Sequence, residues 1–208
     1  FYRNMGAEVT IVEMADRILP AEDEEIAAIA HKAFEKQGMN LHTSSQITEI
    51  KKNKADLTAT LVSGGKEKSI KAEKILMAVG IVANIENIGI EKTKVKVEKG
   101  RINVDKYLET NEPGIYAIGD VVHGPWLAHK ASHEGILVAE KIAGKKNLHT
   151  MDKSNIPGCT YSMPQIASIG MTEKQALDSG LKIKVGRFPF VANGKAIAMG
   201  ETEGLIKT

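Results

Sequence analysis

The hydrophobic positions near the start of the chain follow first a strand pattern and then a helix pattern. A β-branched apolar run from Val9 to Val12 ends on Glu13 and predicts a short, buried parallel strand. Apolar residues then recur every three or four positions between Asp23 and Gln37, which predicts an amphipathic helix that ends at Gly38. A strand followed by a helix is typical of an α/β unit.

The middle of the chain is patterned mainly for strands. Apolar or alternating runs predict strands at Met39–Thr43, Gln46–Lys52, Leu57–Ser63, Glu67–Lys71, Lys74–Gly80 and Ile115–Ile118. The turn residues Ser63 to Lys66 predict a hairpin between two of them. A long helix is predicted from His129 to Ala143, and the polar stretch from Lys145 to Asn155 is typical of a linker.

The pattern of hydrophobic and polar residues changes again from Ile156, where it predicts short strands and a short helix. Strands are predicted at Cys159–Ser162, Gln165–Ile169, Lys182–Phe190 and Ala196–Met199. Thr172 and Gln175 have the spacing of a capping box, which predicts a helix that runs to Gly180. This last part is therefore expected to be an α+β piece.

Both ends of the chain favour an internal piece of a longer protein. Phe1 to Met5 is typical of the last turn of a helix, which Gly6 would cap. The other end, Gly204 to Thr208, is typical of the middle of a strand. Domains do not usually begin in the last turn of a helix, so we expect further protein on both sides.

Composition and charge exclude several classes of protein. The 208 residues are 42% hydrophobic and 26% charged, which is ordinary for a folded chain and argues against disorder. The net charge of +2 gives no electrostatic footprint for nucleic acid, and no apolar run approaches the roughly 20 residues of a membrane span. Cys159 is the single cysteine, so no internal disulfide can form, as suits a reducing compartment.

Glu13 is the first candidate for chemistry. An acid at the end of the second strand of a dinucleotide fold accepts hydrogen bonds from a ribose diol. The glycine-rich turn that usually accompanies it would lie before residue 1, about 20 residues earlier. On the strand and the acid alone, a solvent-exposed surface acid is the favoured alternative.

A second constellation lies between Thr110 and Lys130. A turn at Pro113-Gly114 leads through a short apolar run to Gly119-Asp120, where glycine lets a ligand approach the backbone and the carboxylate can accept hydrogen bonds from a polyol. A helix begins shortly afterwards, and its exposed N–H groups could stabilise negative charge on a reduced flavin. The alternative is an aspartate in a helix-capping loop.

These segments resemble the pyridine nucleotide-disulphide oxidoreductase family over nearly the whole chain. Thr110–Asp120 is similar to the second FAD motif of that family, and Val121–Ala131, followed by Glu134-Gly135, is similar to its dihydrolipoamide dehydrogenase branch. Met5–Glu13 resembles the NAD-domain strand, and Ile156–Glu173 and Ala192–Ala196 resemble the dimerisation domain.

The resemblance implies an α/β fold class and a division into three partial domains. Residues 1–78 would be the C-terminal part of an NAD-binding Rossmann-like domain, and residues 79–149 the C-terminal part of an FAD-binding one. Residues 150–208 would begin an α+β dimerisation domain.

The resemblance also implies cofactor-binding residues. For FAD these are Gly119, Asp120, Trp126, Leu127, Ala128 and His129, and for NAD they are Glu13, Ile47 and Gly80. The family usually follows that last glycine with two arginines and a proline, whereas this chain has Ile81-Val82-Ala83-Asn84.

As an enzyme of this branch, the protein would oxidise protein-bound dihydrolipoamide to lipoamide with FAD and NAD. It would work as a homodimer with lipoyl-bearing subunits of 2-oxoacid dehydrogenase or glycine cleavage complexes, in the bacterial cytoplasm or the mitochondrial matrix. The family's redox cysteine pair and catalytic His–Glu pair have no counterpart in these residues, so we expect no catalytic residue here. His129 and His133 lie one helical turn apart but have no third ligand, so no metal site is expected either.

Four alternatives stay open. Glutathione reductase-like or mercuric reductase-like enzymes and NADH oxidase use the same scaffold, and a non-catalytic dinucleotide-binding module would keep only the cofactor sites. An NADP enzyme should carry basic residues where Glu13 stands, so Glu13 favours NAD, although Arg17 is nearby.

Overall fold

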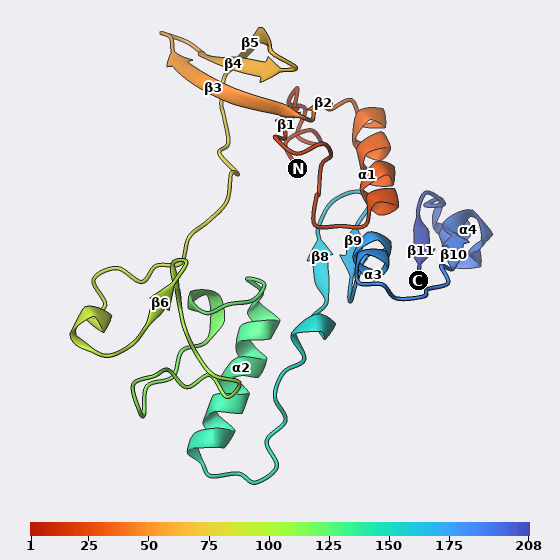
Figure 1. Cartoon of the computed structure of the whole chain (residues 1–208). Helices are drawn as coiled ribbons and strands as arrows, with labels where there is room; N and C mark the ends of the chain where they lie inside the picture. Colours follow the sequence, from red (N-terminus) through yellow and green to blue (C-terminus); the bar gives the residue numbers. More distant parts are fainter. The chain divides into compact units, whose positions relative to one another are not determined.

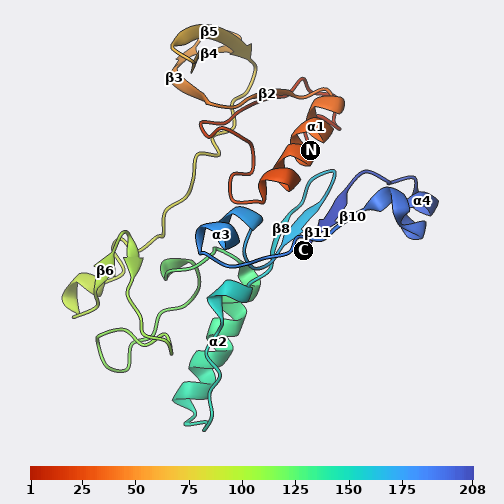
Figure 2. The ribbon, with the colours of Figure 1, turned by 45° about the vertical axis from the view of Figure 1, so that its right-hand side comes forward.

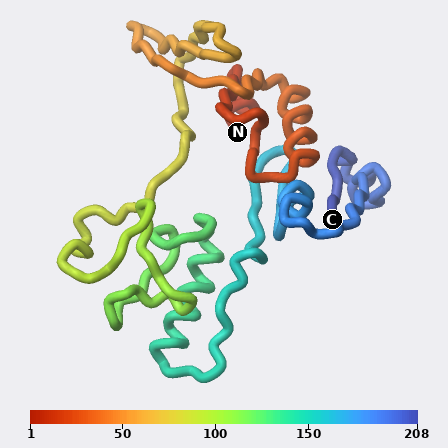
Figure 3. Tube along the Cα trace, in the orientation of Figure 1, coloured from red at the N-terminus to blue at the C-terminus, as the bar shows by residue number.

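A computed structural model describes all residues from 1 to 208. The chain forms two compact units: Phe1–Met77 packs with Cys159–Thr208, and Ala78–Gly158 forms the second unit. Figure 3 traces this path, in which the chain leaves the first unit after residue 77 and returns to it at residue 159. The first unit is therefore discontinuous in sequence and the second is continuous.

The first unit opens with the predicted strand and helix. Strand β1 (Thr10–Val12) pairs in parallel with β2 (Asn40–His42), and α1 (Glu24–Lys36) connects them. The carboxylate of Asp23 accepts from the Glu25 N–H at 3.0 Å, which satisfies one of the free donors at the start of α1. The buried face of α1 consists of Ala27, Ala30 and Ala33, as the periodicity predicted.

Three of the predicted strands form a three-stranded antiparallel sheet, and the predicted hairpin joins two of them. Its strands are β3 (Ser45–Lys52), β4 (Leu57–Ser63) and β5 (Lys66–Ala72), in the order β3-β4-β5. Gly64 and Gly65 both have positive φ, which suits the tight hairpin between β4 and β5. Figures 1 and 2 show this curved sheet on the far side of β1 and β2 from α3.

The C-terminal part of the first unit is an α+β piece. It contains β8 (Gly158–Thr160), β9 (Ile166–Ser168), α3 (Glu173–Asp178), β10 (Arg187–Pro189), α4 (Gly194–Met199) and β11 (Leu205–Lys207). The predicted capping box is present, with Thr172 Oγ1 accepting from Gln175 N at 3.2 Å and Thr172 N donating to Gln175 Oε1 at 2.9 Å. Ile166 packs against Ile18 and Ala30 in one small core, so the two parts of the unit share buried surface.

One predicted strand of this part is wrong. Ala196–Met199 belongs to the helix α4, because Asn193 accepts from the Ala196 N–H at 3.0 Å at one end and Gly200, with φ 71°, ends the helix at the other. The strand expected over Lys182–Phe190 is confirmed only at β10.

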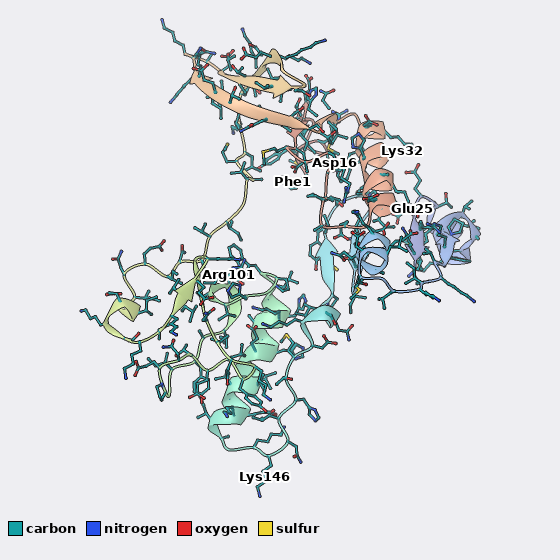
Figure 4. All side chains as sticks on the ribbon, viewed as in Figure 1. Phe1, Asp16, Glu25, Lys32, Arg101 and Lys146 are labelled. Carbon is teal, nitrogen blue, oxygen red and sulfur yellow. The ribbon has the colours of Figure 1, made fainter.

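An ion-pair network ties α1 to the C-terminal part of the first unit. The ammonium of Lys207, on β11, lies 2.7 Å from an oxygen of Asp23 and 2.7 Å from one of Glu173. Arg187 adds a contact of 2.8 Å to Glu25, which Figure 4 labels at the start of α1. The side chains of Lys207 and Asp23 are only 10% and 15% exposed, so solvent screens this contact less than a surface pair.

The network shifts the pKa values of its members in opposite directions. Burial acts to raise the pKa of Asp23, but hydrogen bonds from Lys207 and from the backbone of Glu173 and Glu25 outweigh it, so this pKa lies below its usual value. Burial likewise acts to lower the pKa of Lys207, but its bonds to Asp23, Glu173 and Glu25 raise that pKa above its usual value. Asp23 therefore stabilises the fold above about pH 4, and this stability is lost as the pH falls through its lowered pKa. Lys207 stabilises the fold below about pH 10, and its share is lost as the pH rises through its raised pKa.

Lys207→Met should lower the free energy of unfolding by about 2 kcal/mol at neutral pH, because charged hydrogen bonds are lost from a mostly buried site. The variant should also lose less stability than wild type on acidification to about pH 3, since the pKa of Asp23 would be less depressed without the Lys207 ammonium. Denaturant titrations of the intact protein at both pH values measure this. Lys174→Met, which removes an exposed pair with Asp178, is the control and should change little. Equal acid sensitivity in wild type and Lys207→Met would contradict the assignment.

The second unit is built around one long helix, α2 (Ala128–Ile142), which was predicted to within a residue at each end. Its other elements are short: η1 (Ile90–Lys92), β6 (Val97–Glu98), β7 (Arg101–Ile102), η2 (Gly119–Val121) and η3 (Lys153–Asn155). Ile102, Ala117 and Val122 form its buried core. No helix of either unit is both long and apolar enough to cross a membrane.

Two strands predicted for this region are wrong. Lys74–Gly80, which spans the boundary between the two units, forms no strand, and Leu76, Met77 and Val79 are 63–85% exposed. A strand needs a neighbour to complete its ladder, and these residues make no bridge. Ile115–Ile118 makes only an isolated bridge between Tyr116 and Glu109. The backbone of Leu108 has φ 67°, which interrupts the extended conformation opposite and limits the pairing.

Candidate functional site

Glu13 lies directly after β1, at the carboxyl end of the parallel pair of strands. Its N–H donates to the His42 carbonyl at 2.8 Å, and its carbonyl accepts from Ser45 N at 3.0 Å. One carboxylate oxygen accepts from the Ala15 N–H at 2.7 Å, which fixes the direction of the half-buried side chain. The other carboxylate oxygen has no protein partner and is free to accept from a ligand.

The structure brings a second predicted residue close to Glu13. Ile47 lies on β3, two residues beyond the Ser45 that bonds to Glu13, and it is half-buried. An apolar side chain and a carboxylate on these two adjoining segments suit a ligand with a flat ring and a polyol. Gly80 belongs to the second unit, where it is exposed with φ 117° and has open space at its Cβ position.

Gly119 and Asp120 open η2 in the second unit. Gly119 is buried and has φ 74°, a conformation that favours glycine, and an added Cβ would lie 3.5 Å from the Ala131 side chain. Asp120 is exposed, and no hydrogen bond or ion pair within the chain uses its carboxylate. The acid is thus held by backbone geometry and is available as an acceptor.

A buried ion pair holds the backbone at Gly119. Lys130 and Glu134 lie one turn apart on α2, with Lys130 Nζ 3.0 Å from Glu134 Oε1. Lys130 Nζ also donates to the Gly119 carbonyl at 2.9 Å, and Glu134 Oε2 accepts from the Gly119 N–H at 2.7 Å. The two residues are 1% and 2% exposed, so both polar groups of Gly119 are bonded to charges out of contact with water.

The loop from η2 to α2 carries the remaining predicted residues. Arg101 donates to the Gly124 carbonyl at 3.0 Å, and its guanidinium carbon lies 4.8 Å from the centre of the Trp126 ring. Figure 4 labels Arg101 close to the start of α2. The indole nitrogen of Trp126 is buried without a hydrogen-bond partner, an unusual state that a bound acceptor would relieve.

The start of α2 has free donors. Leu127 is the N-cap residue and makes no side-chain hydrogen bond, and the first helical bond runs from Ala131 N to the Leu127 carbonyl. The N–H groups of the first turn, which begins with Ala128 and His129, are therefore open to an anion or a carbonyl oxygen. The His129 ring nitrogen Nε2 lies 2.9 Å from the Pro157 carbonyl, which anchors this residue.

All predicted FAD residues thus lie within one short stretch of the second unit, around η2 and the start of α2. Lys130 and Glu134 are not among the residues predicted for the site, because charged side chains are almost always exposed. The sequence did carry a signal, since Lys130 and Glu134 have the spacing of one helical turn and follow Gly119 and Gly124 along the chain. Gly124 was also missed: a Cβ there would lie 2.9 Å from Lys130 Cε, so glycine makes room for the buried lysine.

The remaining candidates for chemistry lie outside this region. Cys159 is an exposed residue of β8, as expected for a strand position. No cluster of three or more His, Cys, Asp or Glu side chains forms in either unit.

Comparison with known proteins gives consistent results. The family model described as pyridine nucleotide-disulphide oxidoreductase matches residues 1–135, and the model for its dimerisation domain matches residues 156–208. A dihydrolipoyl dehydrogenase of Rhizobium etli is 51% identical over all of this chain and 43% of its own length. One of Zymomonas mobilis is 47% identical over all of this chain and 45% of its own length.

A solved structure shares the fold. The HOCl-induced flavoprotein disulfide reductase RclA of Escherichia coli matches with a TM-score of 0.88 and 27% identity, over 99% of this chain and 47% of its own. The chain therefore spans less than half the length of each of these relatives.

Proposed function

The chain belongs to the pyridine nucleotide-disulphide oxidoreductase family, and we propose that the protein containing it is a dihydrolipoyl dehydrogenase, which oxidises protein-bound dihydrolipoamide to lipoamide with FAD and NAD. We call that protein the parent protein. The observation that carries the proposal is the identity of 51% and 47%, over the whole chain, to two relatives with this name. The chemistry of the candidate site supports it independently.

The residues around η2 fit FAD. Asp120 would accept hydrogen bonds from the flavin's polyol chain, and the open N–H groups at the start of α2 would face the partial negative charge of the flavin ring. The unpartnered indole N–H of Trp126 could donate to the same ligand. When bound, FAD would relay electrons from a dithiol to NAD. The residues described here would hold and orient it.

The residues around the β1–β2 edge fit NAD. The free oxygen of Glu13 would accept from a ribose hydroxyl, because the other oxygen is held by the Ala15 N–H. Ile47, on β3 of the same unit, would pack against the adenine. Gly80 belongs to the second unit, and we propose it for NAD because it lacks a Cβ and would let a cofactor approach its own backbone.

The proposal extends to domains and partners. Residues 1–78 and 79–149 would complete an NAD-binding and an FAD-binding domain, and residues 150–208 would begin the domain that joins two subunits. The dimerisation-domain match over residues 156–208 supports a homodimer. Lipoyl-bearing subunits of 2-oxoacid dehydrogenase or glycine cleavage complexes would supply the dihydrolipoamide.

The test is an assay of the purified parent protein. We expect a visible flavin spectrum and reduction of NAD by dihydrolipoamide, with NADP a poor substitute. Parallel assays with NADPH and glutathione disulfide, NADPH and mercuric ion, or NADH and oxygen cover the other enzymes on this scaffold. Faster turnover in one of these would replace the proposed substrate, and no turnover with any of them would favour a binding module.

A further inference from the structure

We propose that Lys130 and Glu134 are positioning residues for the flavin, acting through the peptide groups of Gly119. This inference rests on the proposed function and deepens it. Both side chains are almost completely buried, and neither contacts the surface where Asp120 lies open. Their part would be to hold the backbone that presents the acid.

Lys130 and Glu134 bind both polar groups of the Gly119 backbone, and we call this pair the clamp. Glu134 accepts from the Gly119 N–H at 2.7 Å and Lys130 donates to the Gly119 carbonyl at 2.9 Å, while the two charges lie 3.0 Å apart. Gly119 has φ 74° and adopts this conformation without side-chain strain, so the clamp selects one of several accessible backbone conformations. Asp120 follows directly, and the clamp therefore sets the direction from which its carboxylate leaves the backbone.

The cost of burying two charges argues for a role beyond stability. A buried ion pair is often no more stabilising than well-packed apolar side chains of the same size. Here the pair also satisfies the N–H and the carbonyl of Gly119, which apolar replacements could not do. The loop accommodates the lysine by having glycine at Gly124, where a Cβ would lie 2.9 Å from Lys130 Cε.

Two double variants separate positioning from stability. Lys130→Met/Glu134→Leu removes both charges and both bonds to Gly119. Lys130→Met/Glu134→Gln also removes both charges but keeps an acceptor for the Gly119 N–H. Neither leaves an unpaired buried charge, which avoids the largest penalty. The Leu double variant leaves the N–H and the carbonyl of Gly119 without these partners, so it should be less stable than the Gln double variant. The control Leu137→Ala creates a cavity one turn further along α2, where the side chain is buried but does not contact Gly119.

The measurements are the flavin dissociation constant of each parent protein, the flavin absorption band shape, and the melting temperature without flavin. We expect the Leu double variant to bind flavin at least about tenfold more weakly than wild type, or about 1.4 kcal/mol, with an altered band shape. The Gln double variant should recover part of this affinity. Leu137→Ala should lower the melting temperature while leaving the affinity of the folded protein close to that of wild type.

Three outcomes would overturn the inference. Wild-type affinity in the Leu double variant would mean that the pair does not position the site. The pair would be only structural if both double variants lost the same flavin affinity and if Leu137→Ala also lost affinity in proportion to its fall in melting temperature. A wild-type parent protein that binds no flavin would overturn the proposed function, and this inference with it.

Discussion

Asp120→Ala should leave the parent protein largely without flavin after purification. The carboxylate has no partner within the chain, so its hydrogen-bonding capacity is available for the ligand. Each hydrogen bond to a charged acceptor contributes about 1.5–3 kcal/mol, and the variant would leave the ligand's hydroxyl donors unpaired under the bound flavin. The flavin dissociation constant should therefore rise by about one to two orders of magnitude.

Flavin content per subunit and titration of the flavin-free protein measure this effect. Asp120→Asn keeps an acceptor at the same place without the charge and should lie between wild type and the alanine variant. Glu91→Ala removes an exposed acid of the same unit and should have no effect. Full flavin content in Asp120→Ala would show that the Asp120 carboxylate does not contribute to flavin binding.

Glu13→Arg should produce the second large effect, a shift of cofactor preference from NAD towards NADP. The free oxygen of Glu13 would repel the 2′-phosphate of NADP, and like charges at this separation cost on the order of a few kcal/mol at intermediate dielectric. Arg17 does not offset this readily, because its guanidinium already lies 3.2 Å from Asp16 and 3.6 Å from Glu24. Glu13→Ala should raise the KM for NAD and narrow the preference to a smaller extent.

The measurement is the ratio of kcat/KM for NAD to that for NADP in the parent protein and its variants. Glu8→Ala is a matched control, since Glu8 is an exposed acid that precedes β1 and so lies at the opposite end of that strand from Glu13. Glu13 would not select the cofactor if the wild type already preferred NADP, or if neither Glu13 substitution changed the ratio of kcat/KM. Its role would then be limited to the hydrogen bond with the Ala15 N–H.

Elements with strong local signals could be predicted from the sequence. Helix α1 was predicted from its periodicity and Asp23, and the start of α3 from the spacing of Thr172 and Gln175. These signals act within a few residues, so neighbours elsewhere in the chain cannot easily override them. The strand predicted at Ala196–Met199 is wrong, since Asn193 caps the start of a helix there and Gly200 ends it.

Features that depend on distant partners could not be predicted. An apolar run such as Lys74–Gly80 becomes a strand only if another strand lies beside it, and periodicity carries no information on that. The burial of Lys130 and Glu134 depends on a loop that returns Gly119 to the face of α2. The same is true of Lys207, whose partners Asp23 and Glu173 come from separate parts of the sequence.

The split of the first unit has a consequence for the order of events during synthesis. Asp23 leaves the ribosome early, but its partner Lys207 is 184 residues further along the chain. The contact between Asp23 and Lys207 cannot form until Lys207 has left the ribosome. All residues of Ala78–Gly158 emerge before Lys207 does. Residues 1–77 must therefore wait with the Asp23 carboxylate lacking its lysine partner, while the inserted segment can complete its own contacts. During that interval the Ile18 and Ala30 side chains also lack Ile166, so the nascent chain exposes apolar surface that chaperones bind.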